Sequence, residues 1–156
     1  MALRVVRYDD PDALKLIAEL QQEYVQRYGQ QDLTPVEPSE FAPPRGLFLL
    51  GYAGGEPVVC GGWRAHDGDE PGFQDGDAEL KRMYVPPAAR GRGYARAVLT
   101  ELERTAREAG RRRCVLETGS VQPEAIGLYT SSGYTEIDKF GLYQCDSRSR
   151  YYAKML

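Results

Sequence analysis

Three arginines and two glycines stand directly before an apolar helical pattern, in the segment ARGRGYAR at residues 89–96. A glycine-rich turn that leads into a helix N-terminus binds anions, because its N–H groups point outward and the helix dipole adds partial positive charge. Gly91 and Gly93 would let the backbone approach such an anion closely. Charge-assisted hydrogen bonds would come from Arg90, Arg92 and Arg96. Because positive charge opposes the dipole at this end of a helix, an anionic ligand explains the arginines better than solvation does.

Two common nucleotide-binding motifs do not account for this segment. The P-loop pattern GxxxxGK[ST] is absent from the sequence. The dinucleotide pattern GxGxxG begins at Gly91, but Arg96 stands at the position of its third glycine. The anion is therefore expected to belong to another class of ligand.

The composition predicts one domain over residues 1–156. The chain is 42% hydrophobic and 28% charged, with a net charge of −3, which argues against a nucleic-acid partner. No apolar run approaches the ~18 residues of a membrane span, and the first residues are not typical of a signal peptide. Three widely spaced cysteines and a single histidine argue against a disulfide framework and a metal site. We therefore expect a cytoplasmic protein without a metal.

The rest of the sequence predicts the helices and strands that must position the arginine segment. Asp10 and Pro11 predict the start of a helix that ends near Gly29, and a proline-rich, irregular segment follows it. Apolar runs on both sides of Gly54-Gly55 predict a hairpin. Strands are expected at residues 3–10, 47–65 (two), 78–85, 113–118, 134–137 and 150–156, and helices at 11–28, 93–109 and 123–133. This order predicts a mixed α+β fold with a parallel pair of strands near the middle of the sheet.

The apolar phase of the strand before the arginine segment changes halfway along it. Ala78 and Leu80 share one face, whereas Met83 and Val85 share the other. A β-bulge near Lys81-Arg82 explains the change, and bulges are frequent beside active sites.

A second motif strengthens the interpretation of the arginine segment. Residues 90–95 fit the pattern [QR]-x-x-G-x-[GA], and QPEAIGLYTSSGY at 122–134 is close to N-x-x-A-x-x-L-Y-x-x-x-G-[FY]. Gln122 stands where many proteins with this second pattern have Asn. The matching positions are Ala125, Leu128, Tyr129, Gly133 and Tyr134. Two motifs in this order, each on the expected element, resemble those of the GNAT superfamily of acyl-coenzyme A N-acyltransferases, and the resemblance extends loosely over nearly the whole chain.

The resemblance implies a single-domain GNAT fold, with a mixed, mostly antiparallel sheet of six or seven strands, flanking helices and a splayed parallel pair. It also implies acetyl-coenzyme A (acetyl-CoA) as cosubstrate. The N–H groups of residues 91–96 would bind its pyrophosphate, and its pantetheine arm would run along the bulged strand. The residues expected to bind the coenzyme are Met83, Tyr84, Val85, Arg90, Gly91, Arg92, Gly93, Tyr94, Ala95, Arg96 and Gln122.

Acetyl transfer to an amine needs a neutral amine, a stabilised oxyanion and a proton for the departing thiolate. By resemblance, Tyr129 is the general acid toward the coenzyme sulfur. Glu79, beside the bulge, is the expected base, acting directly or through water, with Glu117 on the neighbouring strand in reserve. The N–H group near Val85 would donate to the thioester oxygen.

The acceptor is expected against the first helix and the proline-rich segment, where Glu23, Tyr24, Tyr28 and Glu37 are candidate contacts. We expect a primary amine on a small molecule, because nothing suggests a long peptide groove. His66 opens an acidic loop and is expected at the surface. A protein or peptide N-acetyltransferase, a non-catalytic coenzyme-binding sensor and a toxin that acetylates aminoacylated tRNA stay open as alternatives. Many members of the family are dimers, so a homodimer also stays open.

Overall fold

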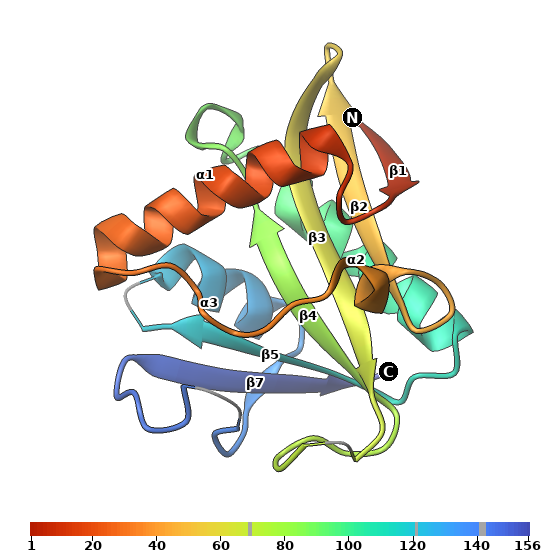
Figure 1. The fold of residues 1–156 in the computed structure, drawn as a ribbon, viewed down its shortest axis with the longest axis vertical. Coiled ribbons are helices and arrows are strands. Elements are labelled where there is room, and N and C mark those ends of the chain that lie inside the picture. Colours follow the sequence, from red (N-terminus) through yellow and green to blue (C-terminus); the bar gives the residue numbers. More distant parts are fainter. Residues whose placement is uncertain (69, 121, 141–142) are drawn as a thin grey trace.

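A computed structural model describes residues 1–68, 70–120, 122–140 and 143–156. Its strands form one seven-stranded sheet in the order β1-β2-β3-β4-β5-β7-β6, in which β4 and β5 are parallel and the other neighbours antiparallel (Figure 1). The strands are β1 (Ala2–Val6), β2 (Gly46–Ala53), β3 (Glu56–His66), β4 (Asp77–Tyr84), β5 (Arg113–Gly119), β6 (Thr135–Glu136) and β7 (Ser149–Met155). The helices are α1 (Pro11–Tyr28), α2 (Tyr94–Glu108) and α3 (Pro123–Ser131), with short 3₁₀ turns η1 (Pro38–Phe41) and η2 (Pro87–Ala89).

Helices cover both faces of the sheet. α1 packs on one face, where Leu16 and Leu20 join a buried cluster with Phe48 of β2. α2 and α3 pack on the opposite face, where the buried cluster includes Leu102 and Tyr129. Figure 1 shows α1 crossing in front of the strands and α2 behind them. The predicted mixed sheet with flanking helices is confirmed.

The first helix begins and ends at the residues that the sequence indicates. The Asp10 side chain accepts a hydrogen bond from the N–H of Asp12, and Pro11 occupies the first turn, where its missing N–H costs nothing. Gly29 ends the helix with a left-handed φ of 82°. The preceding strand is shorter than predicted, because a turn between Arg7 and Asp10 precedes the helix.

The predicted bulge in β4 is present. Cys60 of β3 pairs with Tyr84, and Gly62 pairs with Lys81, so one residue of β3 faces two of β4. Arg82 at the bulge has a φ of 60°, in the left-handed region that non-glycine residues rarely adopt, at a cost of about 1 kcal/mol. β4 therefore bends at Arg82, before the arginine segment begins.

The parallel strands β4 and β5 separate soon after they meet. They pair only from Asp77 opposite Arg113 to Glu79 opposite Val115. Beyond Glu79 they diverge as the arms of a V, while β5 stays paired with β7 as far as Gly119 (Figure 1). We call the paired part the closed end and the separated part the open end. The open end leaves the polar groups of both strands facing a space between the sheet, α1 and α3.

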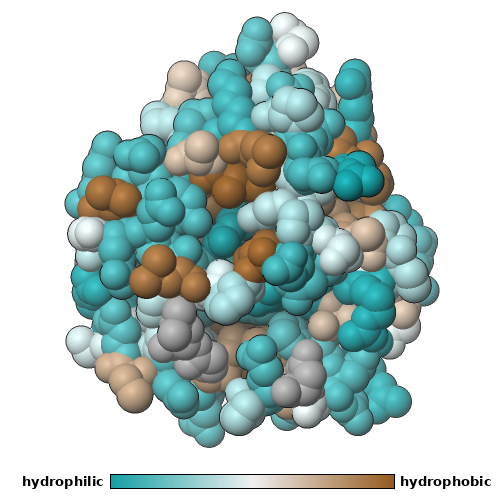
Figure 2. All heavy atoms as spheres, viewed as in Figure 1, coloured by the Kyte–Doolittle hydropathy of each residue, from teal (hydrophilic) through white to brown (hydrophobic). Residues whose placement is uncertain are grey.

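The face seen in Figure 2 is mainly hydrophilic, and its apolar side chains lie in separate small groups. None of the helices in the described ranges combines the length and apolar character needed to cross a bilayer. The described residues also contain no cluster of three or more His, Cys, Asp or Glu suited to a metal ion.

Candidate active site

A groove runs between the end of β4, the start of α2 and one side of α3. Every residue predicted to bind the coenzyme lines it, except Arg92. Tyr129, Leu128 and Ala125 of α3 form the opposite wall. We call this space the loop–helix groove. It brings together residues from two motifs that lie about thirty positions apart in the sequence.

The floor of the groove at α2 is rich in free backbone donors. Gly91 and Gly93 have φ values of 80° and 81°, and a Cβ at either position would meet nothing, so backbone conformation rather than space selects glycine. Gly93 is the N-cap and provides no side-chain cap. The N–H groups of Tyr94, Ala95 and Arg96 in the first turn consequently point outward without helical acceptors. Outward-pointing backbone donors at the positive end of a helix dipole are the features that favour anion binding.

The three arginines of this segment differ in their partners. Arg90 donates to the carboxylate of Glu23 over 2.6 Å and to the carbonyl of Val85 over 2.8 Å. Arg96 donates to the hydroxyls of Ser131 and Ser132, both over 2.9 Å. Arg92 is exposed and makes no ion pair with any residue in the described ranges. Glu23, predicted to contact the acceptor, instead lines the loop–helix groove beside Arg90.

A second cavity, the splay cavity, lies between β4 and β5 at the open end. Tyr129 lines both this cavity and the loop–helix groove. Its ring is buried and meets Tyr134 edge-on, with 5.6 Å between the ring centroids. Burial raises the pKa of the Tyr129 hydroxyl well above its ordinary value, and the negative charge of Glu117 raises it further. Tyr129 is therefore a protonated donor at neutral pH.

Glu117 lies on the other arm of the V and lines the splay cavity together with a third cavity, the acceptor pocket. Its carboxylate accepts a hydrogen bond from the Ser149 hydroxyl over 2.9 Å. Burial raises the pKa of Glu117 above its ordinary value, and the Ser149 bond and the charge of Lys81 offset only part of this effect. A carboxylate with a raised pKa, open to a cavity, is suited to accept a proton.

Glu79 has a different environment at the closed end. One of its carboxylate oxygens lies 2.8 Å from Arg64 Nε and 2.9 Å from His66 Nε2, and the side chain is buried. Burial alone would raise the pKa of Glu79, but the His66 hydrogen bond and the charges of Lys81 and Arg64 lower it to about 2. Glu79 lines none of the three cavities described here. This geometry does not favour Glu79 as the base.

The expectation that His66 lies at the surface is wrong. The residue is 3% exposed, and its ring stacks on Phe73 with 3.7 Å between centroids. His66 is the last residue of β3 rather than the first of the loop, and its side chain faces Glu79 across the strand pair.

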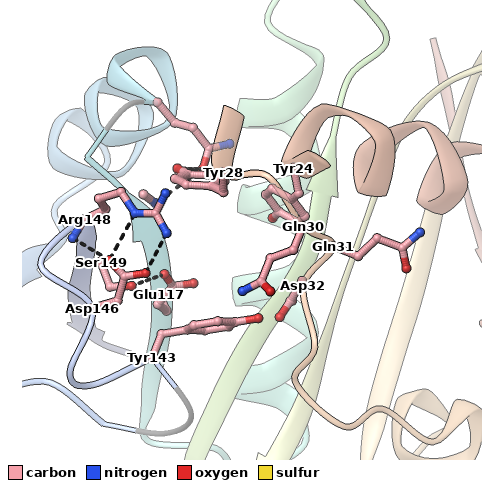
Figure 3. Close-up of a pocket in the computed structure, with 12 residues that line it drawn as sticks. Tyr24, Tyr28, Gln30, Gln31, Asp32, Glu117, Tyr143, Asp146, Arg148 and Ser149 are labelled. Carbon is pink, nitrogen blue, oxygen red and sulfur yellow. Dashed lines mark hydrogen bonds and ion pairs between the residues drawn. The ribbon is translucent and has the colours of Figure 1, made fainter. Parts of the chain in front are cut away.

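The acceptor pocket lies beyond the splay cavity, between the end of α1 and the segment before β7 (Figure 3). Tyr24 and Asp32 lie on one side and Glu117 lies across from them, while Tyr28 and Arg148 lie next to each other. The Arg148 guanidinium stands over the Tyr28 ring, 5.1 Å from its centroid. Tyr24 and Tyr28, two of the predicted acceptor contacts, line this pocket, whereas Glu37 caps η1 instead. The sequence reasoning missed Asp32, Tyr143, Asp146 and Arg148, because they belong to no motif.

Comparison with known proteins identifies the family. The family model for the acetyltransferase (GNAT) family matches residues 13–134. This chain belongs to the GNAT acetyltransferase family. It is 34% identical over 143 residues to an IAA acetyltransferase of Azospirillum brasilense, covering 92% of this chain and 90% of that protein.

Solved structures of other GNAT proteins agree with the fold. A candidate acyl-CoA N-acyltransferase from Klebsiella pneumoniae has a TM-score of 0.80 and 30% identity, covering 99% of this chain and 97% of that one. The PaiA N-acetyltransferase of Thermoplasma acidophilum, solved in complex with coenzyme A, has a TM-score of 0.70 at 16% identity over the full length of both chains. The second likeness concerns the fold alone.

Gln122, where many GNAT members have Asn, joins the three cavities. It lines all of them, and its amide oxygen accepts from the Tyr28 hydroxyl over 3.1 Å and from the N–H of Gly119 over 3.3 Å. Arg27 and Glu124 form an ion pair of 3.1 Å beside this contact. A Cβ on Gly119 would lie 1.4 Å from the Tyr28 hydroxyl oxygen, so glycine is required for this approach. The end of α1 is thereby joined to the start of α3 across the open end.

Proposed function

We propose that this GNAT protein transfers the acetyl group of acetyl-CoA to a primary amine of a small molecule, by direct attack in a ternary complex. One observation carries the proposal: the three cavities form a row in which each cavity shares a lining residue with the next. Tyr129 belongs to both the loop–helix groove and the splay cavity, and Glu117 belongs to both the splay cavity and the acceptor pocket. A donor therefore stands on the coenzyme side of the reaction centre and a base on the amine side.

The loop–helix groove fits the coenzyme. Its free N–H groups at residues 91–96 and the exposed Arg92 match a pyrophosphate and a further phosphate in charge and in hydrogen bonding. Met83 and Val85 line the wall along which the pantetheine arm would run toward the splay cavity. The Thermoplasma protein of the same fold binds coenzyme A, which supports this assignment.

Glu117 and Tyr129 account for the protons of the reaction. Glu117 accepts a proton from the incoming ammonium group, which leaves a neutral amine. The amine nitrogen attacks the thioester carbon, a C–N bond forms and the C–S bond breaks. Tyr129 donates its hydroxyl proton to the departing thiolate, and the proton released from the acylated nitrogen restores the phenol. The products are the N-acetyl amine and free coenzyme A, and Glu117 releases the proton it took from the ammonium group to solvent.

The acceptor pocket supports a small molecule. Tyr28 and Arg148 close one side of it, and the Tyr143 hydroxyl, which accepts from the N–H of Leu33 over 2.7 Å, joins the loop after α1 to the segment before β7. The pocket is thus bounded by contacts between segments rather than drawn out along a strand. The Azospirillum relative is named for IAA, which is a small molecule.

Acetyl-CoA-dependent thiol release on a panel of primary amines tests the function. Saturation with acetyl-CoA at about 100 times its Kd should stabilise the protein by about 2.7 kcal/mol in a thermal-shift titration. Desulfo-coenzyme A should stabilise it to a similar degree, and NAD should not. No thermal shift at millimolar coenzyme, together with no thiol release, would refute the proposal.

The Tyr129→Phe variant tests the proton donor. We expect turnover to fall about 10- to 100-fold, because the thiolate loses its donor, while the Kd for coenzyme A stays within twofold. The matched control is Tyr134→Phe, which removes a buried hydroxyl that donates to Glu103 over 2.8 Å, outside the three cavities. Equal turnover in Tyr129→Phe and the wild type would remove Tyr129 from the mechanism.

A further inference from the structure

Arg82 carries the conformational strain of the bulge. It is the one non-glycine residue with a positive φ in the described ranges. It lies where β4 turns away from β5, directly before Met83 in the wall of the loop–helix groove. The side chain is 5% exposed, so its charge must be neutralised inside the protein.

Asp32 provides that neutralisation. One of its carboxylate oxygens accepts from Arg82 Nη1 over 2.5 Å and from Lys81 Nζ over 3.0 Å, so a single carboxylate holds both bulge residues. The second nitrogen of Arg82, Nε, donates to the Tyr8 hydroxyl over 3.2 Å. The carbonyl of Arg82 accepts from the Cys60 thiol over 3.2 Å.

Asp32 is itself fixed to α1. Its N–H donates to the side-chain oxygen of Gln21 over 2.8 Å. Its other carboxylate oxygen accepts from the N–H of Thr34 over 3.0 Å. Asp32 also lines the acceptor pocket and the splay cavity. One residue therefore connects the acceptor side of the site to the bend of β4 on the coenzyme side.

We propose that Asp32 is a positioning residue, which holds Arg82 in the left-handed conformation and so fixes the bulge at which the open end begins. Through the bulge it sets where Met83 and Val85, and hence the acetyl group, lie relative to the acceptor pocket. This inference rests on the proposed function for its kinetic consequence, but its structural part is independent of any acetyl transfer.

Two substitutions at Arg82 test the structural part. Arg82→Gly and Arg82→Ala both remove the guanidinium, but only glycine adopts a φ near 60° without strain. At an ordinary strand position alanine gives a more stable protein than glycine. A more stable Gly variant would therefore indicate that position 82 requires a left-handed φ. We expect the Gly variant to have the higher melting temperature and at least a tenfold higher kcat/KM than the Ala variant. A melting temperature of the Ala variant equal to or above that of the Gly variant would overturn the inference.

A double variant tests the role of Asp32. Asp32→Asn alone should lower kcat/KM at least tenfold, because Arg82 and Lys81 lose their shared carboxylate. In the Arg82→Gly background the same change should have an effect within threefold, because glycine keeps the bulge without a partner. An equal loss in both backgrounds would show that Asp32 acts through direct contact with the acceptor, and would overturn the positioning role.

The matched control is Asp77→Asn. Asp77 is a fully buried carboxylate on the same strand, paired with Arg113 over 2.8 Å at the closed end. Its loss should lower the melting temperature while kcat/KM stays within threefold in both backgrounds. If the wild type transfers no acetyl group to any amine, the proposed function fails, and the melting temperatures of the two Arg82 variants still decide the structural part of the inference.

Discussion

The two ends of the β4–β5 pair use the same residue types in opposite ways. At the closed end, Asp77 is bound by Arg113 and Glu79 by Arg64 and His66, so each carboxylate is matched by cations or donors. At the open end, the strands have separated, and among the described residues Glu117 has one hydrogen-bonding partner, the Ser149 hydroxyl. Burial therefore raises the pKa of Glu117, whereas the partners of Glu79 lower its pKa to about 2. Glu79 is thus held by structural ion pairs at the closed end, whereas Glu117 keeps a raised pKa at the open end.

Replacing each glutamate with glutamine should give the largest effects and tests the difference between the two ends directly. We expect Glu117→Gln to lower turnover by about 10²-fold or more, because the amine loses its base. Glu79→Gln should leave turnover within threefold and lower the free energy of unfolding by about 3 kcal/mol, since Arg64 loses a buried partner. Steady-state kinetics and urea unfolding on both variants measure these effects. A larger turnover loss in Glu79→Gln would return the role of base to Glu79.

The sequence predicted the parts of the molecule whose determinants are local. The bulge follows from the phase change between Leu80 and Met83, and the left-handed turns before α2 follow from Gly91 and Gly93, so each was predictable at its position. The different environments of Glu79 and Glu117 were not predictable, because Arg64 and His66 reach Glu79 only through the β3–β4 register.

The acceptor pocket was less predictable for the same reason. Tyr28 was expected near the acceptor from its place at the end of the first helix. Arg148 and Tyr143, however, come from the chain before β7, more than a hundred residues later. Only the closing of β7 onto β5, from Ser149 opposite Gly119, brings that segment to α1. A pocket assembled from two distant segments without a motif leaves no signal in one sequence.

As the pH falls, the contributions of the two glutamates to the free energy of unfolding should change in opposite directions. The pKa of Glu79 is about 2 in the folded protein against an ordinary value of 4.5. Its contribution to stability is therefore complete above pH 4.5 and is lost as the pH falls toward 2, by about 3 kcal/mol in all. The pKa of Glu117 is raised, so protonation relieves a buried charge and stabilises the fold as the pH falls through that pKa.

Urea unfolding between pH 6 and pH 2.5 measures both contributions. The difference in unfolding free energy between the wild type and Glu79→Gln should shrink with falling pH. The difference between the wild type and Glu117→Gln should move in favour of the wild type over the acid range. If both differences changed in the same direction, the contrast between the two ends would be lost.

Replacing one arginine near each end should have the smallest effects on affinity and stability. Arg113 is paired with Asp77 at the closed end. Arg92 is exposed between Gly91 and Gly93, which line the loop–helix groove, and makes no ion pair within the described ranges. Arg92→Ala should weaken coenzyme A binding by about fivefold, or about 1 kcal/mol, with an unchanged melting temperature. Arg113→Ala should lower the melting temperature and leave that affinity unchanged. Because salt screens exposed charges, the loss of coenzyme A affinity in Arg92→Ala should become smaller between 50 mM and 500 mM NaCl in calorimetric titrations. A loss of affinity that persisted at high salt would instead place Arg92 in a desolvated contact.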